Sequence, residues 1–344
     1  MEMDKKNMIN YERLDFITIV YGIAVILVVF GHSHPLHIET PFILNKITEF
    51  IYKFHMPLFF FISGILIVYT SKKRISIWRW WRKKVSKLII PYLILSGIAI
   101  IPKFLLGRIM NDDMTFSFDN IIKIIFIPRQ GIWGHFWFIP TYLVLSLIGA
   151  IIFYILNEVQ KSNSLVVKIG YIFICILGFI LYIHPIRTEW FAIEDISIEF
   201  IYVILGIVSS RWIINISMKK ISYFLILFCG VLSILIFMNS NSRISDFYIS
   251  ILMIISVLGI GMSISHEEQN IFTILGKHAF TIYLYSWPFQ VVAEICIVVI
   301  LGLGWYISYP FMFLCGIFGP IIILKIYKKI IPRNKLCDVL LGVE

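Results

Sequence analysis

Three histidines mark the ends of long apolar segments. His32 closes the first of these segments, His55 opens the second and His135 opens the fourth. A neutral imidazole can accept a proton near physiological pH, so a histidine that lines a water-filled cavity can serve as a general base. The alternative for each histidine taken alone is an ordinary residue at the rim of the apolar layer. The pattern indicates a site for proton transfer, provided that the segments bring the histidines together.

Charged residues lie at the other end of the first segment and between the second and third. Arg13 and Asp15 precede the first apolar run, and 17 residues separate Asp15 from His32. A helix rises about 1.5 Å per residue, so its two ends lie about 25 Å apart and face opposite compartments. Arg82 and Lys84 belong to a basic stretch that can bind the phosphates of a nucleotide-bearing substrate. The alternative is that these cations only anchor the chain at a membrane surface.

Two further positions accompany the histidines. Trp137 follows His135 closely, at the same level of its segment, and Ser286 precedes Trp287 and Pro288, where we expect an interruption of the helix near mid-membrane. Ser286 could be a nucleophile, but it lacks the G-x-S-x-G context, so packing at a helix kink is the preferred interpretation. We assign Trp137, Ser286 and Asp15 orienting or structural roles. No CxxC or Cys/His spacing in the sequence indicates a metal site.

The elements that hold these residues are predicted to be transmembrane helices. Of the 344 residues, 59% are hydrophobic and only 15% are charged, whereas soluble domains carry about 25% charged residues. The apolar residues gather in blocks of roughly 20, the length that a helix needs to cross about 30 Å of hydrocarbon. The sequence therefore predicts an all-α, polytopic membrane protein with ten spans: residues 16–34, 47–69, 86–106, 135–156, 165–183, 197–216, 222–239, 247–265, 280–300 and 303–326.

The placement of lysine and arginine predicts the orientation. With the N-terminus inside, 22 of the 30 Lys and Arg residues fall in inside segments and 8 fall outside. We therefore expect both termini in the cytoplasm, as a short segment over residues 1–15 and a tail over about 327–344. This orientation puts His32, His55 and His135 near the outer surface. Anionic lipid headgroups account for the net charge of +10, so nucleic acid is not an expected partner.

Six short blocks of the sequence resemble the motifs of the acyltransferase-3 family of membrane O-acyltransferases. Each block is short and mostly apolar, so the specificity comes from their order, which is the family's order over roughly residues 13–288. The blocks are Gly22–His32 (GIAVILVVFGH), Phe54–Gly64 (FHMPLFFFISG), the basic stretch into Pro91-Tyr92, His135–Phe138, Ile204–Gly206 and Gly276–Pro288 (GKHAFTIYLYSWP). The chain is thus expected to form one transmembrane acyltransferase domain over residues 1–344.

The resemblance implies an enzyme that moves an acyl group, usually acetyl, from cytoplasmic acetyl-CoA to a hydroxyl of an extracytoplasmic glycan. It implies no permanently bound cofactor, a bacterial plasma-membrane location, and partners among polysaccharide-biosynthesis proteins besides the bilayer and the two substrates. His32 occupies the position of the family's essential histidine and is expected to act as base on the acceptor; an acyl-histidine intermediate is the alternative route. His55, His135 and Trp137 are expected to orient the acceptor or stabilise the oxyanion.

Tyr21 departs from the family pattern. The family typically has Arg or Lys eleven residues before the essential histidine, where it is proposed to handle the acyl-CoA. Eleven residues are about three turns, so Tyr21 and His32 share a helix face about 16 Å apart. Three explanations stay open: Arg13 or Lys84 supplies the cation, the donor differs, or activity is weakened. We prefer the first and expect Arg13, Tyr21, Arg82 and Lys84 to bind the acyl-CoA.

A transporter or flippase of a lipid-linked sugar or small solute is the competing function. Ten spans with buried polar groups suit that class equally well by composition. The lack of an evident inverted repeat between the two halves, and the order of the six blocks, favour the enzyme. A catalytically inactive sensor or assembly protein is a third class, which Tyr21 supports.

Overall fold

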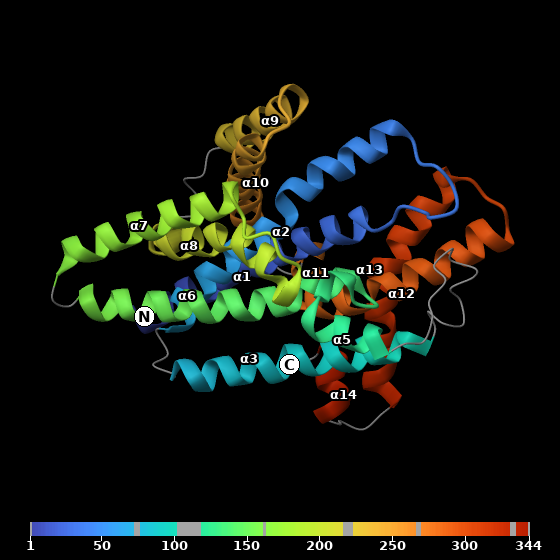
Figure 1. Ribbon diagram of the computed structural model, residues 1–344, viewed down its shortest axis with the longest axis horizontal. Helices are drawn as coiled ribbons and strands as arrows, with labels where there is room; N and C mark the ends of the chain where they lie inside the picture. Colours follow the sequence, from blue (N-terminus) through green and yellow to red (C-terminus); the bar gives the residue numbers. More distant parts are fainter. Residues whose placement is uncertain are drawn as a thin grey trace. The chain divides into compact units, whose positions relative to one another are not determined.

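The computed structural model describes residues 2–71, 76–101, 118–160, 163–215, 223–265, 270–330 and 335–342, with the backbone alone for residues 2–14, 118, 121, 215, 335 and 336. Within these ranges the chain forms thirteen α-helices and no β-strand, which confirms the all-α prediction (Figure 1). The α-helices are α1 (Glu2–Gly31), α2 (Phe42–Ser71), α3 (Ile77–Ile98), α5 (Phe118–Phe126), α6 (Phe138–Gln160), α7 (Ser164–Ile183), α8 (Ile193–Asn215), α9 (Tyr223–Asn239), α10 (Arg243–Ile264), α11 (Ile271–Lys277), α12 (Ala279–Glu294), α13 (Trp305–Ile330) and α14 (Lys335–Leu340). Three short 3-10 helices, η1 (Pro128–Gln130), η2 (Gly134–Trp137) and η3 (Trp190–Ala192), and the π-helix η5 (Ile295–Ile300) complete the described elements.

Six helical segments are long and apolar enough to cross a membrane. They are α2, α6 with η2, α7, α10, α12 with η5, and α13. These segments coincide with the second, fourth, fifth, eighth, ninth and tenth predicted spans. Two shorter apolar helices, Asp15–Gly31 within α1 and the whole of α9, coincide with the first and seventh. The chain is therefore a polytopic membrane protein.

Helices α3 and α8 overlap the third and sixth predicted spans but are not among the long apolar segments. The first half of α3 carries basic residues from Arg79 to Lys87, and α8 carries Glu194, Asp195 and Glu199 in its first two turns. Charged side chains are costly in hydrocarbon. They also make α3 and α8, taken as whole helices, less apolar than the predicted spans. Residues 102–106, the end of the third predicted span, lie outside the described residues.

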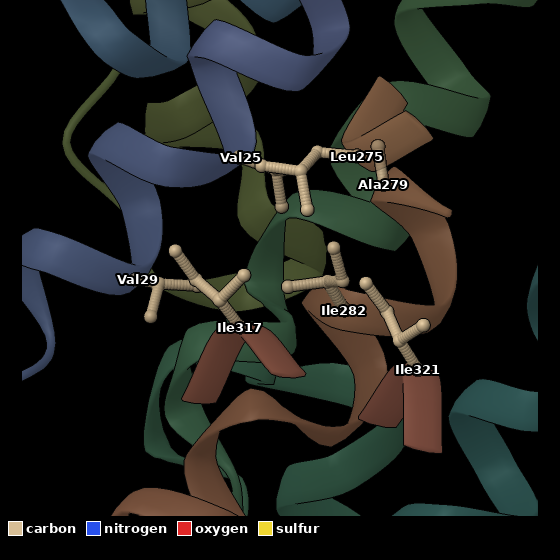
Figure 2. Close-up of a cluster of buried hydrophobic side chains, with 7 residues drawn as sticks. All are labelled: Val25, Val29, Leu275, Ala279, Ile282, Ile317 and Ile321. Carbon is tan, nitrogen blue, oxygen red and sulfur yellow. The ribbon is translucent and has the colours of Figure 1, made fainter. Parts of the chain in front are cut away.

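The described chain divides into two compact units, and the first comprises Met1–Phe59 and Ile216–Glu344. In this unit α1 packs against α10, α11, α12 and α13. A buried apolar cluster joins four of these helices, and its members are Val25, Val29, Leu275, Ala279, Ile282, Ile317 and Ile321 (Figure 2). Contacts of this kind stabilise membrane proteins through van der Waals packing, because lipid is as apolar as the side chains.

Two glycines let α1 and α11 touch backbone to backbone. A β-carbon on Gly22 would lie 2.0 Å from the carbonyl oxygen of Phe272, and one on Gly276 would lie 1.8 Å from that of Thr18. Small residues at such crossings are typical of packed membrane helices. The first and last of the family-like blocks therefore meet at this crossing.

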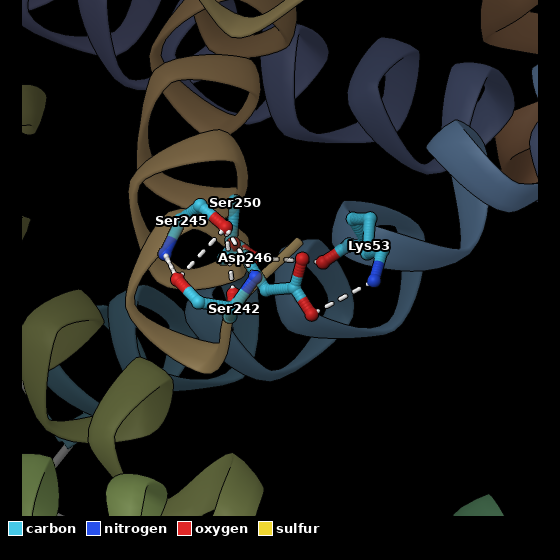
Figure 3. Close-up of polar contacts among 5 residues, drawn as sticks. All are labelled: Lys53, Ser242, Ser245, Asp246 and Ser250. Carbon is cyan, nitrogen blue, oxygen red and sulfur yellow. Dashed lines mark hydrogen bonds and ion pairs between the residues drawn. The ribbon is translucent and has the colours of Figure 1, made fainter. Parts of the chain in front are cut away.

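Polar contacts hold the start of α10 against α2. Lys53 pairs with Asp246 at 2.8 Å, and the Ser250 hydroxyl donates a hydrogen bond of 2.7 Å to the carbonyl oxygen of Lys53 (Figure 3). A capping box between Ser242 and Ser245 begins α10. These contacts fix the part of α2 that carries Tyr52 and His55.

The second unit comprises Phe60–Asn215. Helices α6 and α7 pack on α8, and α3 packs on α5 and α6. A β-carbon on Gly64 of α2 would lie 2.2 Å from the carbonyl oxygen of Val203, and one on Gly206 of α8 would lie 2.1 Å from that of Phe61. Two further family-like blocks thus meet in a close helix crossing inside this unit.

The expected interruption at Pro288 is wrong. Helix α12 continues through Pro288 to Glu294, where it passes into the π-helix η5. Membrane helices tolerate proline when the freed backbone groups find other partners.

The C-terminal residues fold back as α14. Two hydroxyls of α12 hold them: Thr281 and Tyr285 donate hydrogen bonds to the carbonyl oxygens of Leu341 and Leu340, at 2.8 and 2.9 Å.

Candidate active site

His32 is the first residue after α1, and two aromatic side chains flank its ring. The centroid of the Tyr52 ring from α2 lies 6.3 Å away, and that of the Trp287 ring from α12 lies 6.2 Å away, nearly perpendicular to the imidazole. The His32 side chain is half-buried. Aromatic rings on two sides limit how the imidazole can turn.

Tyr52 connects His32 with His55. The Tyr52 ring centroid lies 5.1 Å from that of His55, which is buried. The Nδ1 atom of His55 lies 3.0 Å from the carbonyl oxygen of Ile51. A carbonyl only accepts hydrogen bonds, so Nδ1 carries a proton, and the Nε2 atom of a neutral His55 has a free lone pair. The structure therefore brings two of the three predicted histidines into one site.

Side chains from three other helices hold the last carbonyl groups of α1. These carbonyls have no partner within the helix. Tyr52 of α2 donates to the oxygen of Gly31 at 2.8 Å, and Tyr309 of α13 donates to that of Phe30 at 2.7 Å. The Nε2 group of Gln290 on α12 donates to the oxygen of Val29 at 2.9 Å. His32 thus follows a helix end whose direction is fixed from three sides.

Electrostatics in the loop after α1 favour neutral histidines. Burial lowers the pKa of His32, and the nearby His34 lowers it further. Burial also lowers the pKa of His34, whose Nε2 and Nδ1 atoms lie 2.6 Å from the Thr48 hydroxyl and 3.1 Å from the Thr40 hydroxyl. At neutral pH the His32 imidazole is therefore uncharged, which is the state in which a general base accepts a proton.

The other predicted positions of α1 and α12 lie in the same unit. Tyr21 packs against the apolar cluster of Figure 2, and its ring lies 5.8 Å from that of Phe59. Asp15 is half-buried near the beginning of the apolar run of α1, and Ser286 is buried within α12. The side chain of Arg13 lies outside the described residues.

His135 and Trp137 belong to the second unit, where they form η2 with their neighbours. His135 stacks on Trp133 with ring centroids 5.8 Å apart. The guanidinium of Arg129 lies 4.0 Å from the centre of the Trp137 ring and forms a bidentate ion pair with Asp195, in which Nε lies 2.8 and 2.9 Å from the two carboxylate oxygens. Trp137 is thus held by a cation–π contact from a paired arginine.

The two predicted cations of α3 also belong to the second unit, and they differ in surroundings. Arg82 is exposed. The ammonium of Lys84 lies over two rings, 4.7 Å from the centre of Trp80 and 4.2 Å from the centre of Tyr142. Arg82 is therefore the freer of the two to meet a phosphate.

A family model described as an acyltransferase domain matches residues 14–332, which include the second unit, most of the first and every predicted site residue except Arg13. The chain belongs to the acyltransferase-3 family. The resemblance drawn from the six blocks is thereby confirmed, and so is the prediction of an acyltransferase enzyme, which decides against the transporter. No curated protein and no solved structure matches the chain.

In this acyltransferase-3 protein the sequence did not reveal the side chains that fix His32. Tyr52, Gln290 and Tyr309 were not predicted, and Trp287 was considered only for its effect on the helix. Gln290 carried a usable signal, because a glutamine inside an apolar span is costly unless it has a partner.

Among the described residues of this acyltransferase, no group of three or more His, Cys, Asp or Glu side chains could hold a metal ion.

Proposed function

We propose that this membrane acyltransferase moves an acetyl group from cytoplasmic acetyl-CoA to a hydroxyl of an extracytoplasmic glycan, with His32 as the general base. The single observation that supports this role most is the position of His32: a half-buried imidazole at a helix end that Tyr52, Gln290 and Tyr309 fix. Preorganised groups of this kind are what acyl transfer requires.

The proposed chemistry is a direct transfer. His32 removes the proton of the acceptor hydroxyl, whose oxygen attacks the thioester carbonyl carbon. The tetrahedral intermediate collapses, the carbon–sulfur bond breaks, and the proton held by His32 returns to the CoA thiolate. His55 is assigned to orient the acceptor or to stabilise the oxyanion, because it shares the Tyr52 ring with His32. His135 and Trp137 are proposed to orient the acceptor or to stabilise the oxyanion as well.

The donor is proposed to bind from the cytoplasm. Arg13, Tyr21, Arg82 and Lys84 are the proposed contacts of the acyl-CoA, and Asp15 and Ser286 keep structural roles. Tyr21 lies on α1, which ends directly before His32, so a pantetheine arm can follow α1 toward the imidazole. We further propose that both termini are cytoplasmic, that the protein lies in a bacterial plasma membrane with polysaccharide-biosynthesis proteins as partners, and that residues 1–344 act as one functional domain.

Proteoliposomes with acetyl-CoA on one side and a polysaccharide acceptor on the other test this proposal. We expect O-acetyl groups on the acceptor and an equal amount of free CoA on the donor side. Reversing the two sides should abolish transfer, because the proposed donor cations face the cytoplasm. Absence of acyl-CoA-dependent CoA release with several donors and acceptors would contradict the proposal.

A further inference from the structure

The loop between α1 and α2 is anchored on a single buried carboxylate. Glu294, the last residue of α12, has 1% of its surface exposed. Its Oε1 atom accepts hydrogen bonds from the backbone N–H of Leu36, from that of His37 at 3.1 Å and from Nδ1 of His37 at 2.8 Å. A buried carboxylate is tolerated when charge-assisted hydrogen bonds of this kind satisfy it. Glu294 therefore fixes the chain four to five residues beyond His32.

Glu294 belongs to one face of α12 that follows the chain through His32. Trp287, Gln290 and Glu294 are spaced three and four residues apart, so they lie on the same side of the helix. Trp287 meets the His32 ring, and Gln290 donates hydrogen bonds of 2.9 Å both to the Val29 carbonyl oxygen and to the Ser33 hydroxyl. The three side chains thus contact the ring of His32, Val29 before it and Ser33 after it, and the loop beyond.

We propose that Glu294 is a positioning residue for acyl transfer: by holding Leu36 and His37 to the end of α12, it keeps the chain after α1 in the path that aims the His32 imidazole. This inference rests on the proposed function of His32 as the base. A reacting group must be held within a fraction of an ångström of its productive place, and a displacement of about 1 Å can cost a factor of about 100 in rate. Glu294 acts through the loop and does not touch the reacting atoms.

A catalytic His37–Glu294 pair is the competing interpretation, because a carboxylate that accepts from Nδ1 also orients a base. Two of the three donors to Glu294 are backbone groups, however, and these are what an anchor requires. The two interpretations differ in the effect of His37→Ala. An anchor keeps both backbone hydrogen bonds in that variant, whereas a catalytic pair loses its base.

The test compares four variants in nanodiscs with wild type: Glu294→Ala, Glu294→Gln, His37→Ala and Glu49→Gln. The last is the control, since it removes another carboxylate charge of the same unit that contacts a side chain at 2.6 Å, at an exposed position. We expect Glu294→Ala to lower kcat for acetyl-CoA turnover by about 10-fold or more while KM for acetyl-CoA and the unfolding temperature stay near those of Glu49→Gln. Glu294→Gln keeps an acceptor oxygen for the two backbone groups and should recover part of kcat.

Several results would overturn the inference. One is that both Glu294 variants have the same kcat as the wild type. Another is a His37→Ala variant as inactive as His32→Ala, which would identify the catalytic pair. A third is failure of both Glu294 variants to fold, which would make Glu294 a requirement of the fold rather than of the site. A His32→Ala variant measured beside them separates the two proposals: if it keeps turnover, the proposed role of His32 fails, and if it alone loses turnover, only the role of Glu294 fails.

Discussion

The hydroxyl of Tyr52 donates a hydrogen bond of 2.8 Å to the carbonyl oxygen of Gly31, the residue before His32. The same Tyr52 ring lies beside both His32 and His55. Gly31 makes this contact possible, because a β-carbon there would lie 2.4 Å from the Tyr52 ring. One side chain of α2 therefore sets both the end of α1 and the spacing of two histidines.

Tyr52→Phe should lower activity while leaving the fold intact. The variant keeps the ring between the histidines and loses the hydrogen bond to Gly31, which is worth about 0.5–1.5 kcal/mol. We expect kcat to fall by roughly 2- to 10-fold, with KM for acetyl-CoA unchanged. Tyr223→Phe is a suitable control, because Tyr223 is 71% exposed in the same unit. Equal rates in the two variants would contradict a role for the Tyr52 hydroxyl.

Gly276→Ala should prevent folding or destabilise the protein severely. Its new methyl group would lie 1.8 Å from the Thr18 carbonyl oxygen, a backbone atom that cannot move without separating α1 from α11. Overpacking of this kind costs about 1–3 kcal/mol or more. Gly97→Ala in α3 is the control, since nothing lies within 4 Å of the added atom there. Unfolding temperatures and the yield of monodisperse protein measure the difference, and equal values in both variants would refute the close crossing.

Activity should have an acidic limb below pH 6.5. Burial lowers the pKa of His32 from the ordinary imidazole value of 6.5, so the base is neutral at pH 7 and becomes protonated only as the pH falls below that value. The pKa of His34 is lowered in the same direction, so the unfolded state binds more protons there and stability also declines as the pH falls below 6.5.

The rate of acetyl-CoA turnover against pH, with the folded fraction measured in parallel, tests this prediction. The plateau should extend through pH 7 after correction for unfolding. A rate that still rises steeply between pH 7 and 8 would contradict a His32 with a lowered pKa.

Arg82→Gln should weaken donor binding. An exposed guanidinium can pair with a phosphate, whereas the Lys84 ammonium already lies over Trp80 and Tyr142. We expect KM for acetyl-CoA to rise by roughly 3- to 10-fold in Arg82→Gln with kcat little changed, and to rise less in Lys84→Gln. A larger effect of Lys84→Gln would reverse the assignment of the two cations.

The apolar blocks predicted most helices of the fold, because membrane thickness imposes a length that is visible in one sequence. The prediction for α12 failed at Pro288, since the helix continues where a proline alone suggests a break. Helices α3 and α8 begin with charged residues, so each whole helix is less apolar than the apolar block that predicted it.

The site could be predicted only in part, because its support comes from residues far apart in the chain. His32 and His55 were predicted from their positions at segment ends, and the structure puts them beside one tyrosine. Gln290 and Glu294 contact residues that lie more than 250 positions away, and no local periodicity signals such pairs. In the sequence Tyr309 is likewise an ordinary aromatic residue, and only the structure shows that its hydroxyl donates a hydrogen bond to the Phe30 carbonyl oxygen.

The central claim is that His32 is the base of acyl transfer. The most direct test measures acetyl-CoA turnover by His32→Ala and by wild type in nanodiscs, with equal amounts of folded protein. The account predicts loss of at least about 100-fold in kcat, as expected for removal of a general base. The unfolding temperature should stay close to that of wild type, because the Tyr52, Gln290 and Tyr309 contacts on α1 use backbone carbonyls of other residues. Turnover equal to that of wild type in the folded variant would contradict the account.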